Sequence, residues 1–312
     1  MDLKKRLKKL YYTFLKKKNR LLYGRPVLVL LYHRVNDEVG SKLAELTVSL
    51  ANFEEQLLYF KKHFQILSLD DDWTSLHKTG LVVTFDDGYA DNLLNALPLL
   101  EKHNIPATLF VTTLNINTVN EFWWDRFVFD YYAASDFFFL PGFEEKKSKK
   151  EYTYKFCVEI VSKLGNEDRN KWFLEFELIN EVNYRNREAY RSLTQDELKL
   201  LSEHPLINIG LHTHHHYALG DLSCKDQKEE LLFSIKQLNG LVSNSIKYLA
   251  VPFGSYNNDT LTIAEEIGLK GILLANDYYS SNRNKAGNKI NRIIMPNIKD
   301  EEMINRLRKF DC

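Results

Sequence analysis

A series of seven short apolar segments, separated by polar or helix-like sequence, limits the fold of this chain more than any other feature. None of them alternates clearly between apolar and polar residues, which is typical of strands buried on both faces of a parallel sheet. Helix-like sequence lies between several of them, as in residues 49–63, with Ser49 as N-cap, and residues 226–241, which end near Gly240. Strands alternating with helices predict an α/β fold, either a barrel or an open sheet. The apolar segments span residues 26–35, 64–69, 80–87, 107–113, 207–213, 246–254 and 271–276.

Composition and cysteine content are consistent with such a fold. The chain has 312 residues, of which 44% are hydrophobic and 27% charged, so it can build a sizeable core in one large domain or two smaller ones. No apolar run reaches the roughly 18 residues that a membrane span needs. Cys157, Cys224 and Cys312 are far apart and show no CxxC spacing, which argues against a disulfide framework and a thiolate metal site. Any metal ion would have to bind through oxygen or imidazole ligands.

The alternation of predicted strands and helices is interrupted at about residues 115–205. This interval is rich in aromatic residues, glutamate and lysine, and it contains the charged stretch "FEEKKSKKEY". We expect a mostly helical insertion there, within a domain that covers residues 23–312.

The first 22 residues differ from the rest of the chain in charge. Residues 1–20 contain nine Lys or Arg and one Asp, which gives +8, so the remainder carries about −8 because the formal net charge is zero. With the positive charge confined to this tail, we expect no nucleic-acid partner. Leu3, Leu7, Leu10 and Phe14 follow spacings of four, three and four, which predicts a basic amphipathic helix. It could dock on its own domain or lie on an anionic membrane.

The N-terminal sequence also bears on location. It lacks the compact apolar region and small-residue cleavage site of a secretory signal, because lysines recur as far as position 18. We therefore expect a cytoplasmic protein, located at the inner face of the membrane if the tail binds lipid.

The stretch "LVVTFDDGYADN" places Asp86 and Asp87 directly after a predicted buried strand. Two adjacent carboxylates raise the pKa of one of them unless a cation intervenes. The pair is therefore costly unless a positive charge compensates it. On a continuous strand the two side chains would also point to opposite faces.

A second unusual stretch, "NIGLHTHHHYALGDLS", holds four of the nine histidines within five positions. On a helix, His212 and His216 would share a face, whereas on a strand His214 would join them. Either arrangement offers nitrogen ligands for zinc, with an acidic ligand from elsewhere. Asp86 or Asp87 is the natural donor, because catalytic side chains converge at the strand ends of α/β folds.

The combination of "TFDDGY" with a later His-Thr-x-x-His resembles the polysaccharide deacetylases of carbohydrate esterase family 4. The segments "LYHRV", "LTVSLANFEEQLLYFKKHFQILSL", "FWWDRF" and "VPFGSYN" are also similar to this family. The resemblance extends over about two thirds of the chain and leaves the basic tail and much of the insertion unmatched. It implies a distorted seven-stranded (β/α) barrel with a helical insertion.

The resemblance also implies roles for the two motifs. Asp86 matches the general base, and Asp87, His212 and His216 match a metal-binding triad for one divalent ion. Zinc is the first candidate, with cobalt, nickel and manganese as alternatives. Such a site leaves a position open for water and substrate. His214 and His215 occupy variable positions between the ligands.

Two features depart from the usual family pattern. No Leu-x-His motif for a general acid follows position 216, so His33 in "LLYHRV" matches the acid of rearranged members, with a structural strand-end histidine as the alternative. The arginine that often precedes the proline motif is also missing from "YLAVPFGSYN". Arg292 could supply that charge and orient the base, or it could form a surface ion pair.

Candidate substrate-binding residues come from two segments. Trp123 and Trp124 could stack on sugar rings and Asp125 could bind a sugar hydroxyl, although paired tryptophans in a helical insertion are more often core residues. The "VPFGSYN" motif contributes Pro252, Phe253, Gly254 and Tyr256.

Together these features predict a metal-dependent hydrolase that removes an N-acetyl or similar small acyl group from an amino sugar. The substrate would be a glycan or its lipid-linked or nucleotide-linked precursor. One alternative is a glycosidase that uses Asp86 and Asp87, although this leaves the histidine cluster unexplained. The other is a catalytically silent carbohydrate-binding protein with the same fold.

Overall fold

The computed structural model describes residues 24–37, 46–118 and 120–308. The described residues form two compact units, one built from those up to residue 113 and from residue 195 onward, and the other from those between residues 114 and 194. The predicted N-terminal helix at residues 1–22 lies outside the described residues. In the described ranges, no helix combines the length and apolar character needed to cross a membrane.

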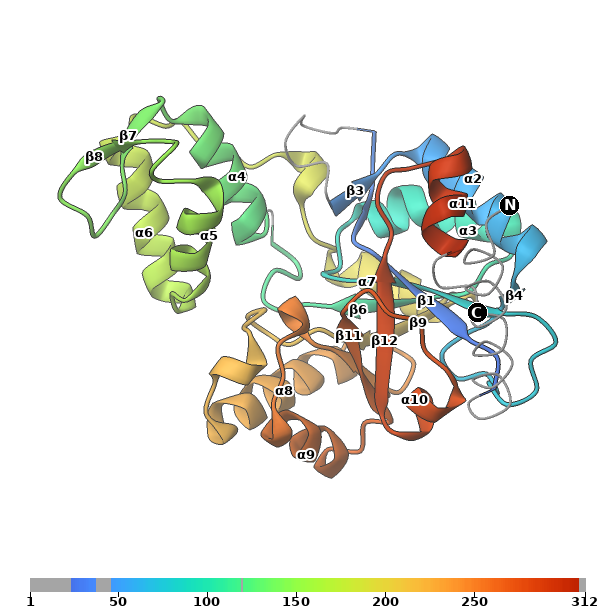
Figure 1. The fold of residues 1–312 in the computed structure, drawn as a ribbon. Coiled ribbons are helices and arrows are strands. Elements are labelled where there is room, and N and C mark those ends of the chain that lie inside the picture. Colours follow the sequence, from blue (N-terminus) through green and yellow to red (C-terminus); the bar gives the residue numbers. More distant parts are fainter. Residues whose placement is uncertain (1–23, 38–45, 119, 309–312) are drawn as a thin grey trace, which may run out of the picture. The chain divides into compact units, whose positions relative to one another are not determined.

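The first unit is a closed barrel of parallel strands, visible at the centre of Figure 1. Strand β1 pairs with β5 on one side and with β12 on the other, and these two contacts close the ring. The β1–β5 register runs over six pairs, from Val27 with Gly80 to Tyr32 with Phe85. The predicted seven-stranded (β/α) barrel is therefore confirmed. In order around the ring, the strands are β1 (Val27–Tyr32), β5 (Gly80–Phe85), β6 (Ala107–Val111), β9 (Ile207–Leu211), β10 (Tyr248–Ala250), β11 (Gly271–Ala275) and β12 (Lys289–Ile294).

The seven strands of the barrel are not the same as the seven segments predicted to be strands. Six of those segments form barrel strands, but residues 64–69 supply only the two-residue strand β4 (Gln65–Ile66). Strand β4 pairs with the beginning of β5, while β6 pairs with the end of β5, so the barrel is distorted at this point. The seventh ring member is β12, whose sequence KINRII mixes polar and apolar residues.

Helices surround the barrel, with α8 beside α9 and α2 beside α3 in Figure 1. Ser49 caps α2 as predicted, because its side chain accepts a hydrogen bond from the Asn52 N–H. Two further short strands, β2 (Arg34–Val35) and β3 (Thr47–Val48), pair with each other. The helices of this unit are α2 (Leu50–His63), α3 (Leu97–His103), α7 (Gln195–Glu203), α8 (Cys224–Asn239), α9 (Asn258–Glu266), α10 (Asn282–Ala286) and α11 (Asp300–Arg308).

The second unit, residues 114–194, is mainly helical and has its own aromatic core. Phe127, Phe138, Phe173 and Phe176 are fully buried or nearly so within it. The interval predicted as an insertion continued to residue 205, but α7 packs against β9 in the barrel unit. The elements of the second unit are α4 (Trp123–Ala133), β7 (Phe137–Phe139), β8 (Lys146–Ser148), α5 (Tyr154–Ser162) and α6 (Asn166–Ile179).

A buried carboxyl group in the second unit makes its stability depend on pH. Burial and the nearby Glu177 carboxylate raise the pKa of Asp130 on α4 to about 8. Arg126 is the nearest cation, but its Nε donates to Glu177 Oε1 at 2.8 Å and lies 3.8 Å from Asp130 Oδ2. The folded protein therefore retains a proton that the unfolded chain releases near pH 4.

A carboxyl group whose pKa is higher in the folded than in the unfolded protein stabilises the fold. This stability is fully present below the pKa of the unfolded state and is lost as the pH rises through the pKa of the folded state. We expect the free energy of unfolding to fall between pH 5 and pH 9 by roughly 1 to 3 kcal/mol more in the wild type than in Asp130→Asn. Denaturant unfolding of both proteins at the two pH values measures this difference. An identical pH dependence in both would show that Asp130 is ionised in the folded state.

Candidate active site

The paired aspartates leave β5 through a tight turn. The Asp86 N–H donates to the Tyr32 carbonyl at 2.9 Å and continues the ladder with β1. The Gly88 N–H then donates to the Asp86 carbonyl at 3.0 Å, and Asp87 has a φ of 75°. A hydrogen bond from residue i+2 to residue i around a positive φ defines a strained γ-turn. The strand geometry therefore stops at Asp86.

This turn brings both carboxylates to the same group. His212 Nε2 lies 3.3 Å from Asp87 Oδ1 and 3.8 Å from Asp86 Oδ2. The expectation that adjacent aspartates point to opposite faces is therefore wrong, because it assumed that the strand continues. Carboxylates on opposite faces would be poorly placed to flank one glycosidic bond, but the turn removes this argument against a glycosidase. The argument that remains is the presence of the histidines beside the carboxylates.

The two outer histidines of the cluster meet at Asp87. His212 directly follows β9, and His216 is reached through a loop rather than a helix or strand. His216 Nε2 lies 3.4 Å from Asp87 Oδ1, and potential ligand atoms of Asp87, His212 and His216 all lie within 4.8 Å of one another. His214 does not join them, because its Nδ1 bonds to Thr113 Oγ1 at 2.7 Å. The strand-spaced alternative, with three histidines on one face, is not formed.

The chemistry of this cluster fits a divalent cation. His212 Nδ1 donates to the Ala250 carbonyl at 2.8 Å, so a neutral His212 ring directs the lone pair of Nε2 toward Asp87. Asp87 Oδ1 is buried and receives no hydrogen bond within the described part of the chain. One carboxylate and two imidazoles are a ligand set that suits zinc and similar ions. Asp87, His212 and His216 could therefore hold such an ion.

Arg292 on β12 also binds Asp86. Its Nη1 and Nη2 atoms donate to Asp86 Oδ1 and Oδ2 at 2.7 and 2.8 Å, and its Nε donates to the Leu274 carbonyl at 3.2 Å. The guanidinium is fully buried, so it does not form a surface ion pair. Burial raises the pKa of Asp86, but the Arg292 guanidinium opposes this effect, and the pKa lies below its usual value. Asp86 is therefore an ionised carboxylate with a fixed orientation.

The segment around His33 is tied to the aspartate motif. The Asn92 side chain donates to the His33 carbonyl at 2.8 Å. Arg34 Nε lies 3.2 Å from Asp91 Oδ2, and the Val35 N–H donates to Asp91 Oδ1 at 3.3 Å. These contacts join two segments that are nearly 60 residues apart in the sequence. Sequence reasoning did not single out Asp91 or Asn92, although both lie within the quoted motif.

The His33 imidazole lies within electrostatic range of the carboxylates. Burial lowers its pKa below the usual value, while the charges of Asp87 and Asp86 oppose that shift. The structure therefore brings His33 to the same strand ends as the aspartates and the histidine pair.

The proline motif borders the candidate metal ligands. Pro252, Phe253 and Gly254 form a tight turn shortly after β10, in which Phe253 and Gly254 have positive φ values of 57° and 67°. The Phe253 ring lies 4.8 Å from the His216 ring and is 57% exposed, so an apolar surface is available beside the candidate ligands. Tyr256 is half-buried just beyond this turn.

Trp123, Trp124 and Asp125, which were predicted to contact sugar, lie in the second unit. Trp124 stacks on Phe122 with ring centroids 4.8 Å apart, and the Arg169 guanidinium lies 4.6 Å from the Trp123 ring centre. Asp125 is buried. Both tryptophans are half-buried, and Trp123 packs against the aromatic core of this unit. Contact of either ring with sugar remains a prediction.

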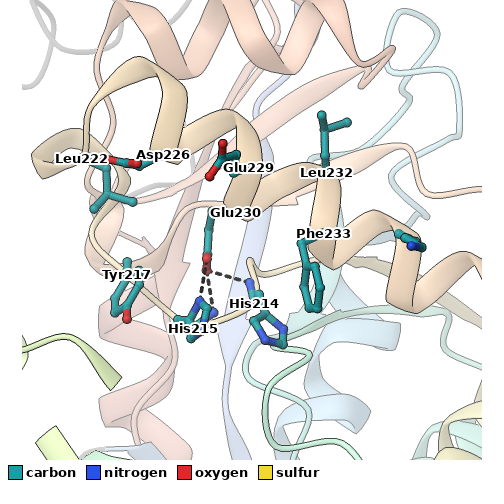
Figure 2. Close-up of a pocket in the computed structure, with 10 residues that line it drawn as sticks. His214, His215, Tyr217, Leu222, Asp226, Glu229, Glu230, Leu232 and Phe233 are labelled. Atoms are coloured by element: carbon teal, nitrogen blue, oxygen red, sulfur yellow. Dashed lines mark hydrogen bonds and ion pairs between the residues drawn. The ribbon is translucent and has the colours of Figure 1, made fainter. Parts of the chain in front are cut away.

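A cavity of about 690 Å³ lies beside the loop of residues 213–216, which we call the histidine loop (Figure 2). The candidate metal ligands do not line this cavity. Its wall contains Glu230, which sequence reasoning missed and which contacts His214 and His215.

Several known proteins resemble this chain in sequence or in fold. The family model described as polysaccharide deacetylase matches residues 75–272, a range that includes Asp86, Asp87, His212 and His216 but excludes His33 and Arg292. The Bacillus subtilis (strain 168) protein YxkH, provisionally named a polysaccharide deacetylase, is 22% identical over 188 residues. That match covers 60% of this chain and 42% of YxkH, so it spans less than half of the relative.

Solved structures share the fold. The Streptococcus pyogenes deacetylase PplD, solved in complex with acetate, is 20% identical, and the match covers 90% of this chain and 97% of that one with a TM-score of 0.59. IcaB from Ammonifex degensii is 17% identical, with 93% and 98% of the two chains covered and a TM-score of 0.59. Because the family model matches more than half of the sequence, this chain belongs to the polysaccharide deacetylase family.

Proposed function

We propose that this protein is a metal-dependent hydrolase that removes an N-acetyl or similar small acyl group from an amino sugar. The observation that carries the proposal is the convergence of Asp87, His212 and His216 beside Asp86, which Arg292 holds in its ionised form. A divalent ion held by the three ligands would acidify water and polarise the acyl carbonyl.

The residues around the cluster supply the proton transfers. Asp86 accepts a proton from water as the water oxygen bonds to the acyl carbon. Arg292 keeps the carboxylate oriented during this step. His33 then donates a proton to the sugar nitrogen as the carbon–nitrogen bond breaks, which yields a carboxylic acid and a free amine. Because burial lowers the pKa of His33, its protonated form is a strong acid toward the leaving nitrogen.

An activity screen tests this function and separates it from both alternatives. The zinc-loaded or cobalt-loaded protein is incubated with N-acetylated amino-sugar oligosaccharides, lipid-linked precursors and nucleotide sugars. We expect acetate and free amine in equal amounts from one class, without new reducing ends. New reducing ends without acetate would instead identify a glycosidase. Binding of sugar without either product, from a fully metal-loaded sample, would identify a silent carbohydrate-binding protein.

We further propose that the N-terminal tail brings the enzyme to lipid-linked substrate. Its apolar stripe at Leu3, Leu7, Leu10 and Phe14 would enter the membrane interface while its basic residues approach anionic headgroups, each contributing on the order of 1 kcal/mol. Co-sedimentation with anionic vesicles should therefore be stronger for the full chain than for a chain that starts near Leu21. If both remain in the supernatant at low salt, a nucleotide sugar or free oligosaccharide becomes the better substrate proposal.

A further inference from the structure

Glu230 on α8 contacts residues 214 and 215, which lie in the same loop as the candidate ligand His216. Its side chain is only 6% exposed and points toward the loop (Figure 2). Oε1 accepts the N–H of His214 at 2.9 Å and also the N–H of His215, while Oε2 lies 2.7 Å from His215 Nδ1. One carboxylate therefore binds three donors in two consecutive residues.

The loop that Glu230 contacts has a strained backbone. Thr213 and His216 have φ values of 63° and 57°. Positive φ is unusual for residues other than glycine and is energetically unfavourable, most clearly for a β-branched residue such as threonine. Such a conformation persists only when surrounding contacts hold it. The position of the His216 ring therefore depends on contacts that hold the loop.

Most of these contacts come from one face of α8. Ser234, one helical turn after Glu230, donates from Oγ to the Thr213 carbonyl at 3.0 Å. Within the loop, Thr213 Oγ1 accepts the His216 N–H at 3.0 Å. Ser234 thus holds the strained Thr213 itself, and Glu230 holds the two residues that follow it.

Glu230 is ionised in this environment. Burial opposes ionisation, but the hydrogen bonds from His215 and from the loop backbone outweigh it and hold the pKa of Glu230 below its usual value. Hydrogen bonds to a charged acceptor are roughly twice as strong as neutral ones. A neutral amide at this position would therefore hold the loop less firmly.

We propose that Glu230 is a positioning residue that fixes residues 213–216 so that His216 Nε2 reaches a divalent ion together with Asp87 and His212. The inference rests on the proposed function, because it assumes that these three residues bind the ion. It also assigns a role to His215, which anchors the loop to α8 without being a ligand.

Metal affinity is the direct test. In the full-length protein, Glu230→Ala should raise the Kd for Zn²⁺ and Co²⁺ by roughly 10- to 100-fold, the usual effect of removing a residue that orients a ligand. Glu230→Gln should show a smaller loss, because the amide oxygen still accepts the backbone N–H groups. The Kd is measured by competition with a chromophoric chelator. The Co²⁺ absorption spectrum reports whether the ligand geometry has changed.

Glu229 provides the matched control, since it lies on the same helix turn but is 67% exposed and pairs only loosely with Lys225, at 3.7 Å. Glu229→Ala should leave both Kd and spectrum unchanged. A folded Glu230→Ala protein with wild-type affinity and spectrum would overturn the inference while leaving the proposed function intact. If Glu230→Ala does not fold, unchanged affinity in Glu230→Gln would overturn it. A wild-type protein that binds neither ion would overturn both proposals.

Discussion

The His216→Ala protein should bind no divalent ion at concentrations that saturate the wild type, and its hydrolytic activity should fall by roughly three orders of magnitude or more. The reason is that only Asp87, His212 and His216 bring ligand atoms together in the described ranges, so the change leaves two ligands. His212→Ala should behave in the same way. Elemental analysis of the purified proteins and acetate release measure the two effects, and a chelator followed by added metal should abolish and restore wild-type activity.

His214→Ala is the control within the same cluster. The His214 ring bonds to Thr113 and packs on Phe233 with ring centroids 4.5 Å apart, while its backbone N–H, which the substitution preserves, binds Glu230. This protein should therefore keep its metal ion. Undiminished metal in both His212→Ala and His216→Ala would disprove the triad. Loss of metal on His214→Ala alone would show that the ligand set includes residue 214.

The sequence predicted the barrel where its strands are buried on both faces. Strands β1 and β5 are buried at every position, so their uninterrupted apolar runs were a clear signal. Strand β12 was missed because Asn291 and Arg292 interrupt its apolar residues. A buried arginine is tolerated only beside a partner, and the partner of Arg292, Asp86, is 206 residues away in the sequence. Local patterns cannot reveal such a pair.

The relative orientation of the two aspartates was also beyond local reasoning. Two adjacent aspartates on a continuous strand would point to opposite faces, but the backbone turns at Asp87, which has a positive φ. Gly88 is a partial signal, because glycine often follows a tight turn. The Thr112 N–H donates to the backbone carbonyl of Asp87 at 3.1 Å and holds the turn, and Arg292 fixes the Asp86 carboxylate. Both contacts depend on tertiary structure.

Glu230 could have been noticed from helix periodicity. The buried positions of α8 follow a stripe in which polar residues replace the usual aliphatic ones, as at Gln227, Glu230 and Ser234. A polar residue on a buried helical face must find partners. The sequence does not say that the partner of Glu230 is the histidine loop, since the loop conformation itself depends on that contact.

Substitutions of Asp86 and His33 should have different effects from substitutions of the metal ligands, because Asp86 and His33 transfer protons and neither is needed to hold the ion. Asp86→Asn and His33→Ala should each retain metal while losing roughly two to four orders of magnitude in kcat, the range of general acid and base catalysis. Asparagine keeps the shape of the Asp86 side chain and one oxygen acceptor for Arg292, so the loss should be in kcat more than in stability. Metal content, unfolding free energy and kcat are measured on the same preparations.

His103→Ala serves as a control for the loss of a buried imidazole. The His103 ring pairs with Glu54 at 2.9 Å, and among the described residues its hydrogen bonds involve no candidate site residue. It should leave kcat unchanged. A His33→Ala protein with near-normal turnover would show that His33 only completes the end of β1, and the general acid would then have to be another group. An active Asp86→Asn protein with full metal content would show that the Arg292 pair holds the barrel together rather than orienting a base. The proton would then have to leave the attacking water by another route.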